Sequence, residues 1–238
     1  ARRANRTALS RTTADNWLPR FRVTSATGTT DPEPLAPCDT VSRPPRFSGL
    51  ETLTVMTIDL NRGLDPIDTD AVMASGENVY ASPQALYVAT NRWAMPDAQG
   101  NTDEVTTTQV HKFDTSSSSE TGYAGSGSVI GHTLNQFSMS EHEGRLRIAT
   151  TKDGLSLVGG DAVVDNGDQS ESYVTVFEER GDKLAQVGQV GGLGKDERIY
   201  AVRFIGTTGY VVTFKQTDPL YTVDLSDPTA PRVTGELK

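Results

Sequence analysis

The sequence has a single cysteine, Cys38, among its 238 residues, so no disulfide can form within the chain. The Cys38 thiol is therefore free, or it pairs with a cysteine outside this sequence. Long apolar runs are also missing: no stretch of 18 residues suits a membrane-spanning helix, and no signal peptide is recognisable. If the sequence is the middle section of a longer chain, the missing signal peptide says nothing about targeting.

Basic residues are scarce over most of the chain. Asp and Glu outnumber Lys and Arg by 31 to 22, although residues 1–22 alone carry six Arg and one Asp. The acidic body of the chain argues against nucleic acid as a partner. The Arg-rich start has helical composition and is interpreted as a solvated helix, with contact to an anionic surface as the alternative. We expect Pro19 to end this segment and Trp17 to pack on the rest of the chain.

Short β-strands separated by turns are the main pattern in the sequence. Ile199–Leu237 predicts four strands with turns rich in Gly, Pro and Asp. The second of these strands, which begins at Tyr210, resembles segments that begin at Leu86 and Leu146. Third strands are expected at Val55–Asp59, Val110–Asp114, Val174–Glu178 and Leu220–Asp224, and fourth strands at Thr69–Met73, Tyr123–Val129, Leu184–Val190 and Arg232–Leu237.

This repeat predicts an all-β fold built from β-propeller blades of four antiparallel strands, since four strands in about 40 residues is the size of one blade. We expect a helical arm and Pro-rich linker over residues 1–46 and a blade segment over residues 47–238. Three to four blades fit, with four third-and-fourth-strand hairpins but three first-and-second pairs. An incomplete ring has open edges, which further blades or a second copy must cover. A β-sandwich is the alternative fold.

Several segments resemble one family in particular. They include NQFSMSEHEGRLRIATT at Asn135–Thr151, VGGLGKDERIYAVRFIG at Val190–Gly206 and the run Gly209–Lys238. The chain is similar to the middle of bacterial and archaeal secreted proteins that contain a C-terminal β-propeller domain. This resemblance implies the propeller fold and an extracellular or cell-envelope location, but it supplies no activity and no catalytic residues.

The motifs of common enzymes are missing from the sequence. Gly125–Gly127 lacks the outer glycines of a nucleophile elbow, and Gly191–Lys195 is followed by Asp196, where a phosphate-binding loop has Ser or Thr. The three histidines form no H-E-x-x-H motif, and we expect His111 to be exposed or at a strand edge. A single cysteine cannot supply a Cys-rich zinc site.

Five residues are binding candidates at the rim of the predicted blades. Arg92 and Trp93 open a long loop and can stack on a sugar ring or a peptide side chain. His142 is expected at a hairpin tip, where its charge can respond to pH. Gln216 and Asp218 lie between two strands of the last blade. For these residues a structural or solvated role is the main interpretation, and ligand binding is the alternative.

One acidic loop is a candidate calcium site. Asp161, Asp165, Asp168 and Glu171 are close in sequence, although their spacing does not match the calcium loop of an EF-hand. A solvated acidic loop is the main interpretation and weak calcium binding the alternative. The sequence predicts no other cofactor.

These observations favour a non-catalytic propeller segment that acts as an interaction scaffold, with a protein or glycan bound at its rim. Two alternatives remain. One is a polysaccharide-acting enzyme with a pair of carboxylates in the propeller channel, and the other is a calcium-stabilised structural module. Fold alone does not choose among them.

Overall fold

The computed structural model describes most of the chain and divides it into two compact units. Unit 1 is Ala1–Ser75 with Asp114–Tyr123, and unit 2 is Gly76–Phe113 with Ala124–Lys238. The described residues are 2–13, 16–45, 48–49, 51–63, 66–92, 106–153, 155–158, 162–165, 170–215 and 218–237, of which 66–67, 155–158 and 162–165 are described by their backbone alone.

Unit 1 contains the expected helix and one blade-like hairpin. The helix α1, Arg2–Leu9, ends well before Pro19, and Trp17 is 63% exposed instead of packing on the β strands. The Trp17 indole donates a hydrogen bond to Thr12 Oγ1, within the same segment. The strands of this unit are β1 (Arg20–Phe21), β2 (Thr24–Ser25), β3 (Gly28–Thr29), β4 (Glu33–Pro34), β5 (Val41–Ser42), β6 (Leu53–Ile58) and β7 (Pro66–Val72), with a 3-10 turn at Cys38–Thr40. The exposed Cys38 lies in that turn.

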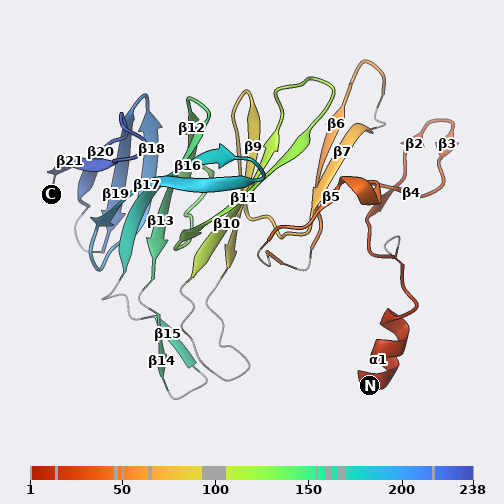
Figure 1. The fold of residues 1–238 in the computed structure, drawn as a ribbon, viewed down its shortest axis with the longest axis horizontal. Helices are drawn as coiled ribbons and strands as arrows, with labels where there is room; N and C mark the ends of the chain where they lie inside the picture. Colours follow the sequence, from red (N-terminus) through yellow and green to blue (C-terminus); the bar gives the residue numbers. More distant parts are fainter. Residues whose placement is uncertain are drawn as a thin grey trace. The chain divides into compact units, whose positions relative to one another are not determined.

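Unit 2 consists of three consecutive four-stranded blades (Figure 1). The first blade is β8 (Asn78–Ala81), β9 (Ala85–Arg92), β10 (Thr107–Asp114) and β11 (Gly122–Ile130). The middle blade is β12 (Met139–His142), β13 (Arg145–Lys152), β16 (Glu171–Arg180) and β17 (Lys183–Leu193). The third blade is β18 (Arg198–Ile205), β19 (Thr208–Phe214), β20 (Leu220–Asp224) and β21 (Arg232–Leu237). Four third-and-fourth-strand hairpins and three first-and-second pairs are present in the described chain, which confirms the predicted all-β blade repeat.

Three of the hairpins formed by a third and a fourth strand have a β-bulge at the same position. The register shifts once between Thr57 and Ile58, once between Val176 and Phe177, and once between Thr222 and Val223. In each hairpin the third strand pairs with a fourth strand that carries one additional residue. A bulge of this kind bends and twists the strand, so the blades share their curvature as well as their strand order.

Two apolar cores hold the three blades of unit 2 together. The first core lies between the first and middle blades and includes Tyr87, Val110, Ile148 and Phe177. The second core lies between the middle and third blades; its members are Ala149, Val174, Val176, Leu193, Ile199, Val202, Val211, Tyr221, Val223 and Leu225. The backbone contributes few pairs to the join between the first and middle blades: in the described chain, Ser126 pairs with Lys183, and His132, just after β11, pairs with Thr151 of β13. Side-chain burial is therefore the main stabilising interaction between blades.

Strands in the interior of unit 2 are buried on both faces. Residues 146–151 of β13 are all buried. His111 of β10 is 0% exposed, so the expectation of an exposed or edge histidine was wrong. The neighbours Val110 and Phe113 are also fully buried, because β10 is an interior strand of its sheet. Burial lowers the pKa of His111 to about 4, because desolvation penalises the charged imidazole.

Glycines in the fourth strands allow each blade to receive a turn of the next blade. A Cβ atom at Gly125 would overlap the backbone of Asp182, in the β16–β17 turn of the middle blade. A Cβ atom at Gly188 of β17 would overlap the Pro228 carbonyl oxygen and the Pro231 ring, in the β20–β21 turn of the third blade. Only glycine permits so close an approach. Gly125 therefore serves packing between blades.

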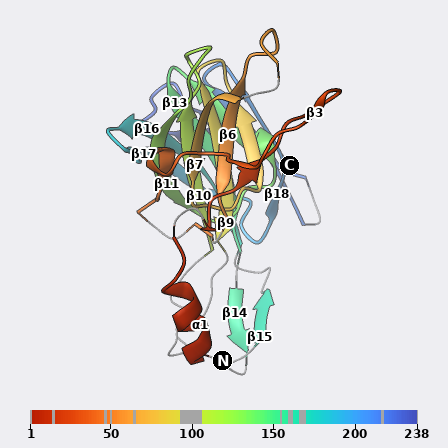
Figure 2. The same ribbon diagram turned by 90° about the vertical axis from the view of Figure 1, so that its right-hand side faces the viewer.

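A further hairpin, β14 (Leu155–Val158) with β15 (Ala162–Asp165), is inserted between β13 and β16. Figures 1 and 2 show this hairpin projecting from one end of the blades. Among the described residues, no helix has the length and apolar character needed to cross a membrane.

Candidate functional site

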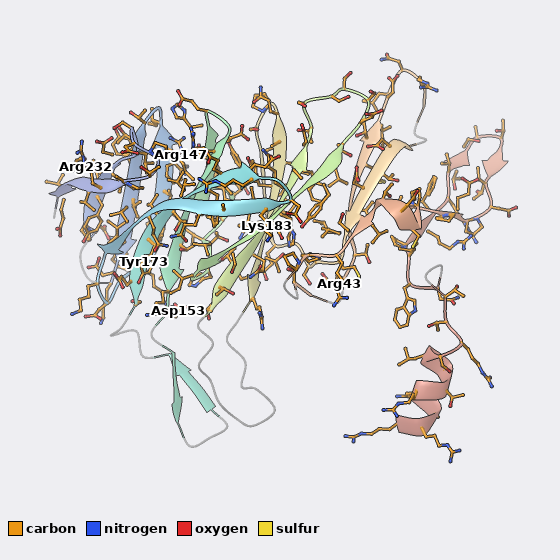
Figure 3. The ribbon with its side chains drawn as sticks, viewed as in Figure 1. Arg43, Arg147, Asp153, Tyr173, Lys183 and Arg232 are labelled. Carbon is orange, nitrogen blue, oxygen red and sulfur yellow. The ribbon has the colours of Figure 1, made fainter. Side chains whose placement is uncertain are left out.

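The two ends of the unit 2 blades carry different groups of charged residues. Arg147 lies near the start of β13 and Asp153 directly follows the end of this strand. Figure 3 shows the two residues at opposite ends of the blades. A pocket lies at the end near Arg147, whereas the inserted β14–β15 hairpin leaves from the end near Asp153.

A pocket of 360 Å³ lies where the first strands of all three blades meet. Its wall is formed by β8, β12 and β18 together with the 3-10 turn Gln136–Ser138 before β12. The lining residues are Val79, Tyr80, Ala81, Gln136, Phe137, Met139, Ser140, Arg203 and Phe204. This set mixes aromatic and aliphatic groups with a few polar ones, as small-molecule pockets do. It contains a cation and no carboxylate.

Arg147 lies directly behind this wall and is 5% exposed. Its Nη2 donates to Ser140 Oγ at 2.7 Å and its Nη1 donates to the Gly206 carbonyl oxygen. The guanidinium also lies over the Phe204 ring, 5.0 Å from the ring centre. Burial lowers the pKa of Arg147, because the charged guanidinium has lost its water.

A carboxylate close to the pocket is already bonded elsewhere. Glu141 follows Ser140 in β12 and accepts hydrogen bonds from Ser82 Oγ at 2.9 Å and Tyr87 Oη at 3.0 Å. The Tyr80 hydroxyl accepts a hydrogen bond from the Glu141 backbone N–H at 2.9 Å. Burial and the adjacent Glu141 charge raise the pKa of Tyr87. These bonds join the first and middle blades and keep the Glu141 carboxylate with its two hydroxyl donors.

The opposite end of the blades is built around a buried carboxylate. Asp153 Oδ2 lies 3.0 Å from His132 Nδ1, and Asp153 Oδ1 lies 3.2 Å from Arg198 Nε. Although burial opposes this effect, the His132 hydrogen bond and the Arg198 charge lower the pKa of Asp153. The carboxylate therefore lies against the Nδ1 side of the His132 ring. The Asp153 carboxylate thus joins His132 and Arg198, which are distant from each other in the sequence.

Glu171, one of the predicted calcium ligands, has protein partners in this structure. Its Oε2 accepts from Tyr173 Oη at 2.6 Å and its Oε1 accepts from the Gly192 N–H at 2.7 Å. Burial and this carboxylate raise the pKa of Tyr173 to about 12. Asp165 is described by its backbone alone, in β15, and Asp161 and Asp168 lie outside the described residues. Within the described chain, no three His, Cys, Asp or Glu side chains are grouped to hold a metal ion.

The predicted rim residues are not brought together. Arg92 is half-buried at the end of β9, whereas His142 is half-buried at the end of β12, near the start of β9. Asp218 is exposed before β20. Trp93 and Gln216 lie outside the described residues. The two described residues of the first and middle blades therefore belong to opposite ends of the blades.

Sequence reasoning missed both Arg147 and the His132–Asp153 pair. Arg147 had a usable signal, since it occupies the position of Tyr87 and Val211 in the repeated second strand. A cation at a position that is otherwise apolar, in a strand predicted to be buried, indicates a specific partner. The His132–Asp153 pair had no comparable signal, because a fold contact brings together residues 21 positions apart.

Comparisons with known proteins agree with this architecture. The family described as "Beta propeller domain" matches residues 1–238. An uncharacterised protein of Archaeoglobus fulgidus is 40% identical over 148 residues, 62% of this chain and 20% of that protein. An uncharacterised protein of Methanocaldococcus jannaschii is 45% identical over 113 residues, 48% of this chain and 16% of that protein. A Trp149Ala mutant of the Synechocystis apocarotenoid oxygenase gives a TM-score of 0.42 at 13% identity over 79% of this chain and 44% of that one, too weak to support an argument.

Proposed function

Since the chain belongs to the β-propeller domain family, we propose that it is a non-catalytic segment of a secreted or cell-envelope protein and acts as an interaction scaffold. The observation that carries this proposal is an uncovered face on the third blade. The chain spans at most a fifth of the relatives it matches, so the activity of a whole protein of this kind is part of the proposal.

One face of the third blade carries a row of apolar residues that no described element of unit 2 covers. Strand pairing places four apolar residues directly opposite one another across the blade: Ala201, Val212, Leu220 and Leu237. Directly opposite residues point to the same face of a sheet. Tyr200, 70% exposed, and Phe214 extend this row, with their ring centres 6.0 Å apart. We call the face made by these six residues the open face.

The third blade, which carries the open face, has the same bulge and the same fourth-strand glycine as the middle blade, whose glycine is covered by the next blade. Gly188 pairs with Val176 directly after the bulge of the middle blade, and Gly235 pairs with Thr222 directly after the bulge of the third blade. Gly188 receives the Pro228–Pro231 turn of the next blade. A Cβ atom at Gly235 would meet only Thr222 Oγ1, within its own sheet. The third blade therefore retains the notch that receives a turn in the middle blade.

The partner best suited to this face is another four-stranded blade. Burying an apolar sheet face against a second sheet is how the two cores of unit 2 are formed. Exposed apolar patches of this kind are typical of interaction sites. Secretion or attachment to the envelope is supported by the resemblance to secreted propeller proteins, and the scaffold role by the missing enzyme motifs.

Self-association of the purified chain tests whether the open face binds another blade, because in that sample the partner blade must come from a second copy of the chain. We expect sedimentation velocity to show concentration-dependent dimers, and the double variant Tyr200→Glu, Leu237→Glu to remain monomeric. Both positions are exposed, so the charges should not unfold the blade. Leu60→Glu, at a residue that is 80% exposed in unit 1, is the matched control and should still dimerise. A wild-type chain that stays monomeric at all concentrations would contradict the proposal.

A further inference from the structure

The pocket between the first strands has a positive character that is unusual for this chain. The protein carries a net charge of −9, yet the pocket is lined by Arg203 and no acidic residue, with Arg147 directly behind the wall. We propose that this pocket binds a small organic carboxylate, with Arg203 and Ser140 contacting the carboxylate group. This site lies within unit 2 and does not depend on the scaffold role.

The first argument is the uncompensated charge of Arg147. Among the described residues it forms no ion pair, and both of its hydrogen-bond acceptors are neutral: Ser140 Oγ and the Gly206 carbonyl. Its Nε is buried without a hydrogen-bond partner in the described chain. A buried cation is costly unless an anion or several hydrogen bonds compensate it. An anion in the pocket would lie on the far side of Ser140 and Phe204 and would supply that compensation.

The second argument is the free donor capacity of Arg203. Its guanidinium carbon lies over the Phe137 ring, 4.1 Å from the ring centre, which holds the group at the pocket wall. One of its five N–H groups is used, by Nη1 on the Val202 carbonyl oxygen at 2.7 Å. The described chain gives it no carboxylate partner. A guanidinium over an aromatic ring can still donate two of its free N–H groups to a carboxylate.

The residues that line the pocket also indicate what kind of molecule carries the carboxylate group. Val79, Phe137, Met139 and Phe204 make much of the wall apolar or aromatic, and Gln136 and Ser140 add polar groups. An inorganic anion would leave this apolar surface without a partner. A pocket of 360 Å³ is at the small end of ligand sites and suits an acid with a compact apolar body, such as an aromatic or branched carboxylate.

Isothermal titration with phenylacetate as the probe tests the proposal, and phenylacetamide is the neutral analogue of the same shape. We expect saturable millimolar binding of phenylacetate that weakens as salt is added, and no binding of the amide. Arg203→Gln should weaken phenylacetate binding about tenfold or more, because it removes the cation at the wall. Arg203→Lys should retain part of the affinity, since it keeps the charge but not the planar fork.

Arg232→Gln is the matched control: it removes an exposed arginine of the same blade, at the β20–β21 turn, and should leave the affinity unchanged. Arg147 itself is a weaker test, because its replacement also removes bonds between blades. Arg203 is exposed, so its variants should fold, and melting curves can verify this. Equal binding of amide and acid, no binding of phenylacetate, or full affinity in Arg203→Gln would each overturn the proposal.

Discussion

The middle and third blades of unit 2 have the same strand order and the same bulge, but they differ in what covers them. Residues 146–151 of β13 are buried without interruption, because the middle blade has a core on each face. In β19, the corresponding strand of the third blade, Val211 is fully buried while its neighbour Val212 is half-buried. The same sequence pattern therefore gives two burial patterns, and the number of neighbouring blades decides between them.

The largest expected difference comes from removing one aromatic ring in each blade. Phe177 of the middle blade is 1% exposed within the first core, whereas Phe214 of the third blade is 48% exposed. Phe177→Ala should lower the free energy of unfolding by about 3–5 kcal/mol, because it leaves a cavity. Phe214→Ala should cost about 1 kcal/mol or less. Urea unfolding of both variants measures the two costs, and equal values would mean that the open face is covered in solution.

The glycine notches give the next largest effect. Gly188→Ala forces a Cβ atom against the Pro228 carbonyl oxygen, so the two blades must separate locally, at a cost of about 1–3 kcal/mol. Gly235→Ala meets only the Thr222 hydroxyl, which can rotate, and should leave the stability of the isolated chain nearly unchanged. Thermal melting compares the variants in dilute solution. A large loss in Gly235→Ala would show that this notch is already occupied.

Acid should act on the first blade rather than on the third blade, which contains no histidine. The pKa of His111 is lowered to about 4 in the folded chain, from an ordinary value of 6.5. As the pH falls from 6.5 toward 4, the unfolded chain therefore binds a proton that the folded chain excludes. Folded stability should decrease over this range, by up to about 3 kcal/mol.

Hydrogen exchange at several pH values locates this effect. Protection should fall first in β9–β11 as the pH is lowered, while β19 and β20 keep theirs. His111→Gln should remove the pH dependence above pH 4, because the amide does not titrate there. If wild type and variant lose protection in parallel, a group other than His111 is responsible.

Calcium should have the smallest effect. The middle blade carries the acidic insertion between β13 and β16, and the third blade has only a short connection between β19 and β20. Because Glu171 is already bonded to Tyr173 and Gly192, the prediction of a solvated acidic loop implies the same melting temperature in calcium and in a chelator. A rise with calcium that disappears in Asp165→Asn would instead support the calcium-stabilised module.

The sequence was sufficient to predict the strands that carry long apolar or alternating patterns. The second, third and fourth strands were placed close to their observed positions, because Leu146–Thr150 and its repeats keep the pattern that burial requires. First strands were harder to place. β8 and β12 have four residues each and include Asn78 and Glu141, so a two-residue period has no room to show.

The candidate site was less predictable than the fold, because its contacts connect blades. Arg147 of the middle blade donates a hydrogen bond to the carbonyl oxygen of Gly206, 59 positions further along the chain. It also lies over the ring of Phe204, which belongs to the third blade, as Gly206 does. No local pattern contains such information. Gly125 of β11 shows the same limit. The sequence was enough to exclude a nucleophile elbow at Gly125, but the role of this glycine in blade packing depends on Asp182 in another blade.

The small number of backbone links between the first and middle blades has a mechanical consequence. Within each blade, force along a strand is shared by rows of hydrogen bonds, but between these blades the described backbone offers two short links, Ser126 with Lys183 and His132 with Thr151. The boundary between blades is thus a plane along which the molecule can shear while each sheet stays whole. Under tension this protein should lengthen in discrete steps of one blade at a time. At each step, the contact between a fourth-strand glycine and the turn of the next blade should break.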